Sequence, residues 1–386
     1  MKRLGMLVVL AVISYVFLIG CGGGGGGGGG GGNTSSNQWD SISTLNSPNY
    51  NTEHSYVWTG TEIIFWGGRD VTAPLYSGLN VNSGAKYNPS KDQWKTISNI
   101  NAPSPRNSHG AVWTGSEMIV WGGSSSTIDN GVVVTLNDGG RYDPISDTWR
   151  PISTMYTLPG LHQPSLIWTG KEVIVLKSPA GFSYGVGIYN PLTDTWRPMS
   201  TGIGLSGVNG GMVCWTGTEV VTYTRKYNYS SDTWSDGGPF RGAQGAPVGG
   251  IMVCTDKDII VYGAVNKKYN YATGLWTTIS SVNAPPIRVD HLMAWTGKEV
   301  LVLGGRLSSR RDYSQPPPPP ILDGASYDPA KDTWTPLPPL PHTVLETMEN
   351  VFAGTEYIIF DQIYVKDNNS ISGGHSIIGG IRTDIP

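Results

Sequence analysis

The stretch Tyr87-Asn88-Pro89-Ser90-Lys91-Asp92-Gln93-Trp94 decides the fold, because its pattern of Tyr, Pro, Asp and Trp recurs along the chain. Three further copies keep all four residues at the same spacing, at 142–149, 189–196 and 327–334. Two copies without the proline lie at 227–234 and 269–276. Such self-similarity is typical of an architecture in which one supersecondary unit is repeated.

A second motif, Trp-Thr-Gly-x-Glu followed by an apolar run, precedes each copy of the first. It begins at Trp58, Trp113, Trp168, Trp215 and Trp295, with looser copies at Cys254 and Phe352. The distance between successive tryptophans of the first motif ranges from 38 residues (Trp196 to Trp234) to 58 (Trp276 to Trp334). That period is typical of a four-stranded propeller blade. One such sheet has two apolar faces, which a radial arrangement of sheets buries against each other.

The units resemble kelch repeats, in which the second strand ends in a pair of glycines. The matching pairs are Gly67-Gly68, Gly122-Gly123 and Gly304-Gly305, whereas Lys177-Ser178, Thr224-Arg225 and Gly263-Ala264 depart from the pattern. The resemblance covers about residues 38–386 and implies an all-β, kelch-type propeller with the architecture of galactose-oxidase-like proteins. It does not specify an activity, because propellers support many functions.

The repeat count predicts seven blades. Seven Trp-Thr-Gly elements are followed by only six Tyr…Trp elements, and Gln38-Trp39 at the start of the domain mirrors Gln93-Trp94. We therefore expect residues 38–43 to supply the outer strand of the blade built from 347–382, so that no sheet edge is left free. Six blades are the alternative if the tail after Phe360 forms no sheet.

The N-terminus indicates export. Lys2 and Arg3 precede an apolar run over 4–20, which is short for a membrane-spanning helix, and Leu18-Ile19-Gly20-Cys21 resembles a bacterial lipobox. We interpret 1–20 as a signal peptide, 21–37 as a polyglycine and polar linker, and 38–386 as the propeller. The resemblance implies lipid on Cys21 and a place in the bacterial cell envelope, on either side of the outer membrane.

Composition restricts the partners. The formal net charge is −3, and only 14% of residues are charged. Nucleic acid is excluded as a partner because phosphate contacts need a basic surface. Aromatic residues make up 10% of the chain, which argues against disorder.

We expect the propeller to be a monomer.

One face of the predicted propeller carries the turns of the two motifs, whose repeated Asp and Glu we interpret as structural. The opposite face carries long, variable loops at 69–83, 124–138 and 306–323, where binding usually resides. Arg106 and His109, like Arg288 and His291, stand just before a first strand, where they could bond blades together or line the central funnel. The candidate ligand-binding residues are Arg69, Asp70, Arg106, His109, Arg241, Arg288, Asp290, His291, Arg306, Arg310 and Tyr313.

These residues favour a non-catalytic module that binds a cell-surface or extracellular protein or glycan, with no cofactor and no metal. The alternative is a carbohydrate-active enzyme of the sugar epimerase or oxidase type, with its site in the central funnel. Kelch-like copper radical oxidases need two His, two Tyr and a Cys cross-linked to a Tyr. Apart from Cys21, the chain has only Cys214 and Cys254, in strands predicted to be innermost.

Two further expectations concern packing. Trp94, Trp149, Trp196, Trp234, Trp276 and Trp334 should be largely buried between blades. Aligning Cys254 with Trp215 places the two cysteines on opposite faces of neighbouring strands, so an inter-blade disulfide is conceivable. We nevertheless expect two buried, unreactive thiols, because free cysteine is commonly buried.

Overall fold

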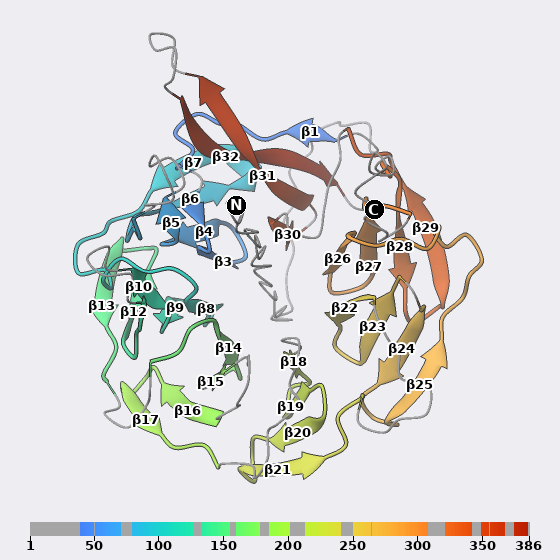
Figure 1. Ribbon diagram of the computed structural model, residues 1–386, viewed down its shortest axis with the longest axis horizontal. Helices are drawn as coiled ribbons and strands as arrows, with labels where there is room; N and C mark the ends of the chain where they lie inside the picture. The colour runs from blue at the N-terminus through green and yellow to red at the C-terminus, as the bar shows by residue number, and fades with distance from the viewer. Residues whose placement is uncertain are drawn as a thin grey trace, which may run out of the picture.

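The protein is a ring of seven four-stranded antiparallel sheets in the computed structural model (Figure 1). The structure describes residues 39–49, 51–70, 79–126, 133–154, 160–177, 185–200, 213–240, 250–263, 265–307, 321–341, 349–354, 356–366 and 374–384. In each of the first six sheets the chain runs from the innermost strand outward. The prediction of an all-β, seven-bladed propeller is confirmed, and the six-bladed alternative is wrong.

The strands follow the repeat. Blades 1 to 3 consist of β3 (Ser55–Trp58), β4 (Ile63–Trp66), β6 (Gly84–Asn88) and β7 (Gln93–Thr96); β8 (Gly110–Trp113), β9 (Met118–Trp121), β12 (Gly139–Asp143) and β13 (Thr148–Pro151); and β14 (Pro164–Trp168), β15 (Val173–Lys177), β16 (Gly185–Asn190) and β17 (Thr195–Arg197). Blades 4 to 6 consist of β18 (Val213–Trp215), β19 (Glu219–Thr222), β20 (Arg225–Asn228) and β21 (Thr233–Asp236); β22 (Ile251–Cys254), β23 (Asp258–Tyr262), β24 (Lys267–Asn270) and β25 (Leu275–Thr278); and β26 (Leu292–Trp295), β27 (Val300–Leu303), β28 (Gly324–Asp328) and β29 (Thr333–Leu337).

Blade 7 joins the two ends of the described chain. It consists of β30 (Glu349–Ala353), β31 (Glu356–Lys366), β32 (Gly374–Asp384) and β1 (Asp40–Ser41). The outer strand β1 pairs with β32 through Asp40 opposite Arg382 and Ser41 opposite Ile381. The predicted closure by the N-terminal segment is confirmed. Because β1 occupies the edge of β32, the ring closes without a covalent bond between its ends.

Both sequence motifs are explained by hydrogen bonds. In Trp-Thr-Gly-x-Glu the Thr side chain accepts the Glu N–H, as at Thr114 and Glu117 (3.0 Å), which fixes the turn between the first two strands. In the first motif the Tyr of the third strand pairs directly with the Trp of the fourth, as Tyr142 does with Trp149. The Asp between them adopts a left-handed conformation, for example φ 55° at Asp147, a region that Asp tolerates.

The same Asp and Trp link each blade to the one before it. Asp147 of blade 2 accepts the Tyr142 hydroxyl (2.7 Å) and the N–H of Ser98 (2.8 Å), which follows the outer strand of blade 1. Trp149 Nε1 donates to the Ser98 carbonyl (2.9 Å). We call this set the inter-blade link. Equivalent sets centre on Asp92, Asp194, Asp232 and Asp332.

The outer-strand tryptophans pack at the blade interfaces, but to different depths. Trp94, Trp149 and Trp334 are buried, at 5%, 2% and 4% exposed. The other three are partly exposed rather than buried: Trp196, Trp234 and Trp276. The expectation of burial is thus confirmed for three positions. The shallower three belong to blades 3 to 5, where the repeat departs most from its consensus.

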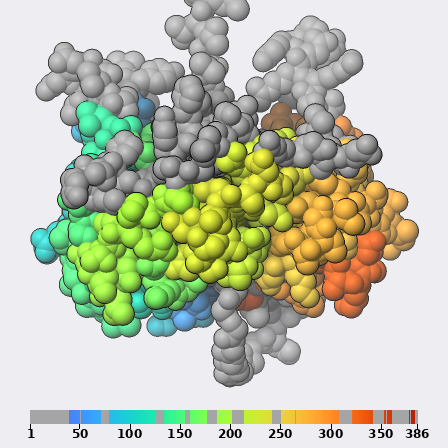
Figure 2. All heavy atoms as spheres, turned by 90° about the horizontal axis from the view of Figure 1, so that it is seen from below, coloured from blue at the N-terminus to red at the C-terminus, as the bar shows by residue number. Residues whose placement is uncertain are grey.

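The blades form one continuous body. Blades 3, 4 and 5 lie side by side without a gap on the outer wall (Figure 2). Among the described residues, each of the seven interfaces between blades holds its own cluster of buried apolar side chains. In that part of the chain no helix has the length and apolar character needed to cross a bilayer.

Candidate functional site

The diglycine pairs shape the face that carries the long loops. Gly67 and Gly68 have φ of 72° and 95°, a region that favours glycine. A Cβ on Gly68 would lie 2.8 Å from the Thr52 carbonyl oxygen, so the chain entering blade 1 needs glycine there to pass. That close approach allows β2 (Asn51–Thr52) to pair with β5 (Arg69–Asp70). In blade 2 a similar ribbon joins β10 (Ser124–Ser126) to β11 (Val133–Thr135).

Four equivalent residues form a polar collar where the innermost strands begin. Each stands five positions before the tryptophan that ends the innermost strand and has a left-handed φ between 51° and 59°: Glu53, Ser108, Gln163 and Asp290. The collar is connected across blades 1 to 3, since Ser108 N–H donates to the Glu53 carbonyl (2.9 Å) and Gln163 N–H to the Ser108 carbonyl (2.8 Å). The Ser108 hydroxyl also donates to the Glu53 carboxylate (2.7 Å). Sequence reasoning found only Asp290. The other three share a position relative to the strand rather than a residue type.

Candidate residues on the loop face are partly exposed and paired. Arg306, directly after a diglycine, lies 3.6 Å from the carboxylate of Asp290, and their side chains are 25% and 36% exposed. Arg69 occupies the place in blade 1 that matches Arg306, and it forms the half-buried strand β5 together with Asp70. The structure therefore brings Asp290 and Arg306 together, while Arg69 and Asp70 lie in a separate ribbon.

Arg106 and Arg288 form hydrogen bonds and ion pairs within the propeller. Both side chains have no exposed surface. Arg106 Nη1 donates to the carbonyls of Gly122 (3.1 Å) and Asp138 (2.9 Å), and Nη2 pairs with the Asp138 carboxylate. Arg288 repeats the arrangement with Gly304 (3.0 Å) and Asp323. Each guanidinium thus satisfies the carbonyl of the first diglycine residue and anchors the loop that follows.

His109 and His291 are buried beside these arginines, at 8% and 0% exposed. His109 Nε2 is hydrogen-bonded to the Ser55 hydroxyl at 2.7 Å, which joins blade 2 to blade 1. Burial and the neighbouring Arg106 lower the pKa of His109 to about 3. Burial and Arg288 likewise lower the pKa of His291 to about 3. Both imidazoles are therefore neutral across the physiological range.

Other candidates lie outside the described residues: Arg241, Arg310, Tyr313 and the lipidation site Cys21. The long loops at 69–83, 124–138 and 306–323 are described only in part, with 71–78, 127–132 and 308–320 outside. The ribbons and the collar belong to the described part of the loop face.

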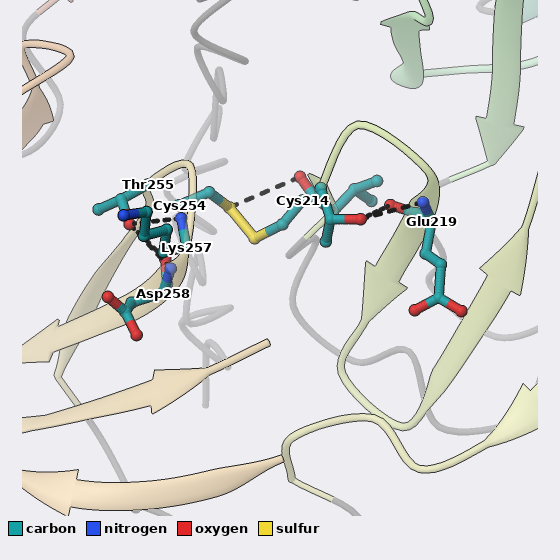
Figure 3. Close-up of a disulfide and its surroundings, with 8 residues drawn as sticks. Cys214, Glu219, Cys254, Thr255, Lys257 and Asp258 are labelled. Atoms are coloured by element: carbon teal, nitrogen blue, oxygen red, sulfur yellow. Dashed lines mark hydrogen bonds between the residues drawn. A yellow bond between two sulfur atoms is a disulfide. The ribbon is translucent and has the colours of Figure 1, made fainter. Parts of the chain in front are cut away.

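The two cysteines of the propeller are bonded to each other, contrary to the expectation of free thiols. Cys214 of β18 and Cys254 of β22 form a disulfide between blades 4 and 5, with Cα atoms 5.7 Å apart (Figure 3). The prediction of two unreactive thiols is wrong. The alignment placed the two side chains on facing surfaces, and the innermost strands of these two blades approach closely enough for a bond. A recess of about 30 Å³ adjoins the disulfide, with Trp215, Thr255, Asp256 and Trp295 in its lining.

The comparisons support the architecture. No protein-family model matches the chain, and no curated protein sequence is detectably similar. Among solved structures it is similar to a fungal alcohol oxidase of the AA5 family, determined in complex with copper, with a TM-score of 0.58 and 16% identity. The match covers 91% of this chain and 77% of the oxidase. At that identity the likeness establishes the class of protein, a seven-bladed β-propeller similar to that of galactose-oxidase-like proteins.

The residues present do not fit a copper radical centre. Such a centre needs a cysteine bonded to a tyrosine, and both cysteines of the propeller are bonded to each other. Among the described residues, no three His, Cys, Asp or Glu side chains come together in a way that could hold a metal ion. The histidines of this region are engaged elsewhere: His109 with Ser55, His54 with the Asn51 carbonyl and His162 with the Ser124 hydroxyl.

Proposed function

We propose that this chain is a kelch-type propeller, anchored by lipid in the bacterial cell envelope, which binds a protein or glycan without catalysing a reaction. The kelch assignment is supported by the diglycines of blades 1, 2 and 6 and by the Tyr–Trp pairs of the outer strands. The loop face is the proposed contact surface, because variable loops on a rigid scaffold are where binding usually resides.

One contrast carries the proposal. Arg106, Arg288 and His109, which have the chemistry for a reactive funnel, bond internally and reach little or no solvent. By comparison, the Asp290–Arg306 pair on the loop face is fixed in position yet remains partly exposed. A surface that offers oriented polar groups suits hydrogen bonding to a partner more than it suits proton transfer to a substrate.

The experiment is a glycan array and a pull-down with residues 38–386. Replacing both Asp290 and Arg306 by Ala should weaken binding at least tenfold if the loop face is the contact surface. Lys298→Ala is the matched control, because Lys298 is a 68% exposed charge in a Trp-Thr-Gly-x-Glu turn on the opposite face. Equal binding by both variants would place the contact elsewhere.

The proposed lipid anchor at Cys21 is supported by the N-terminal sequence. The apolar run over 4–20 ends at Cys21, and the propeller begins at β1, with a glycine-rich tether between them. The disulfide fits an exported protein, because disulfides persist in oxidising compartments. Expression in a bacterial host with labelled palmitate should label the chain, and Cys21→Ser should abolish both label and membrane association. A labelled Cys21→Ser variant would refute lipidation at this residue.

The alternative is a carbohydrate-active enzyme with its site in the central funnel. Its support is the likeness to the alcohol oxidase, which concerns the fold alone. Copper-supplemented oxidase assays on primary alcohols and sugars, and epimerase assays on free sugars, test it directly. If the purified protein shows oxidase or epimerase activity, and substitution of a residue in the funnel abolishes it, the enzyme is favoured over the binding module.

A further inference from the structure

In the part of the chain that the structure describes, the interface between blades 4 and 5 has the fewest fully buried side chains of the seven, while six further apolar side chains pack there partly buried. Among the described residues, its buried cluster comprises five side chains: Cys214, Val221, Ile259, Val261 and Tyr269. The other six clusters contain between eight and eleven buried residues. Burial of apolar surface is the main force between blades, and a larger share of the apolar side chains at this interface stays partly open to solvent than at the other six.

The inter-blade link is also incomplete there. Gly274 occupies the place of the linking Asp, with a left-handed φ of 70°, so the turn is kept while the carboxylate is lost. The donor is lost as well, because Trp276 Nε1 donates to the carbonyl of Pro239 (2.8 Å), and proline has no N–H to offer. At the blade 6–7 interface Pro338 likewise accepts from Trp39 (3.3 Å), but that core has nine buried residues.

The disulfide lies at this weak interface. It joins the innermost strands β18 and β22, whereas Gly274 directly precedes the outer strand β25 and Pro239 follows the outer strand β21 (Figures 1 and 3). Both cysteines line the recess, but Cys214 is only 1% exposed, whereas Cys254 is partly exposed. The Sγ of Cys254 is therefore the sulfur that an external thiolate reaches first.

We propose that the Cys214–Cys254 disulfide is a redox-sensitive device that holds the ring closed between blades 4 and 5, and that its reduction opens the ring at this interface. The covalent bond takes the place of the missing link and of the smaller core. Opening elsewhere is opposed by complete links or larger cores, so the conformational change is confined to blades 4 and 5.

The co-reactant is a dithiol. One of its thiolates attacks Cys254 Sγ, the disulfide bond breaks, and Cys214 leaves as a thiolate that takes up a proton. The second dithiol sulfur then attacks the mixed disulfide and releases Cys254. Two electrons and two protons pass to the propeller, which holds two thiols, and the dithiol becomes a disulfide.

Hydrogen exchange measured by mass spectrometry tests the proposal on residues 38–386, oxidised and after treatment with dithiothreitol. A disulfide that closes a loop of 40 residues constrains the open state strongly, so we expect exchange in β18 and β22 to accelerate by roughly 10²–10³-fold on reduction. Strands β3 and β8 face each other across the interface between blades 1 and 2, where the inter-blade link is complete, so their exchange rates should not change on reduction. Unchanged rates in β18 and β22, or an equal acceleration around the ring, would overturn the proposal. A variant with both cysteines replaced by Ser should behave as the reduced protein does.

A second variant restores the missing link. Gly274→Asp together with Pro239→Ser supplies the carboxylate and the donor, and the Tyr269 hydroxyl lies 3.7 Å from where the new Cβ would stand. In the reduced protein this variant should bring exchange in β22 back toward its oxidised rate. The matched control is Gly274→Ala with Pro239→Ser, which has no carboxylate. If both variants exchange equally fast when reduced, the compensation between disulfide and link is refuted.

Discussion

At the scale of single residues, the carboxylate of Asp147 joins blade 2 to blade 1. Burial alone would raise the pKa of Asp147, but the hydrogen bonds from Ser98 and Tyr142 outweigh it, and the pKa is lowered overall. Burial, and then the bond to this carboxylate, raise the pKa of Tyr142. The pair is thus an ionised acceptor with a neutral donor, the stronger kind of hydrogen bond.

Asp147→Ala should therefore destabilise the propeller by about 2–4 kcal/mol, since two donors lose a charged acceptor. Asp147→Asn keeps an oxygen in place and should cost less than half as much. Urea unfolding of both variants measures the difference. Equal losses would mean that the link depends on the negative charge, which both variants lack, and that an amide oxygen at this place contributes nothing.

The buried histidines give the stability a pH dependence. Each imidazole binds a proton near pH 6.5 when unfolded but only near pH 3 when folded, so the unfolded state gains protons first and stability falls as pH drops below about 6.5. Between pH 7 and pH 5 the loss should be roughly 2 kcal/mol for each histidine. His291→Gln should flatten this slope, measured by unfolding at both pH values.

At the scale of the strand, the outer-strand tryptophans are less exposed in the blades that keep the consensus repeat than in blades 3 to 5. Trp149 is 2% exposed, and its ring centroid lies 5.1 Å from that of Trp66 in the preceding blade. Trp276 stands at the equivalent place but is partly exposed, beside the incomplete link. The same residue type therefore contributes unequally around the ring.

Trp149→Ala should cost about 3–5 kcal/mol and Trp276→Ala about half of that, because less apolar surface is lost. Thermal or urea unfolding of the two variants provides the comparison, with the cysteines kept oxidised in both. Equal costs would show that the depth of the ring does not set its contribution.

The strands could be predicted from the sequence, because the Tyr, Asp and Trp of each repeat have a bonding role that tolerates few substitutes. The collar could not, since Glu53, Ser108 and Gln163 are related by backbone conformation and not by residue type. The disulfide was missed for a different reason. The register of Cys214 and Cys254 set the faces on which they lie, but the distance between two innermost strands depends on how the whole ring packs.

At the scale of the whole molecule, the ring depends on the short strand β1. Trp39 is 8% exposed, donates to Pro338, and packs edge-on against Tyr357 at 6.5 Å between ring centroids. On the other side Ser43 accepts from Trp94 (2.8 Å) and donates to Asp92 (2.8 Å). A segment of a few residues thus contacts blades 6, 7 and 1, and its loss would open the ring on both sides.

Removing residues 38–45 should accordingly lower the stability of the propeller by several kcal/mol, since it deletes a buried tryptophan and an inter-blade link together. It should also uncover the edge of β32, whose free N–H and carbonyl groups can pair with another chain, so the truncated protein should self-associate more than residues 38–386 do. Size-exclusion chromatography with light scattering and a urea titration measure both effects. Trp39→Ala separates them, because it loses the side chain while the backbone pairs of Asp40 with Arg382 and Ser41 with Ile381 still cover the edge. A stable, monomeric truncated chain would show that the ring is held closed by packing between blades 6, 7 and 1 without the N-terminal strand.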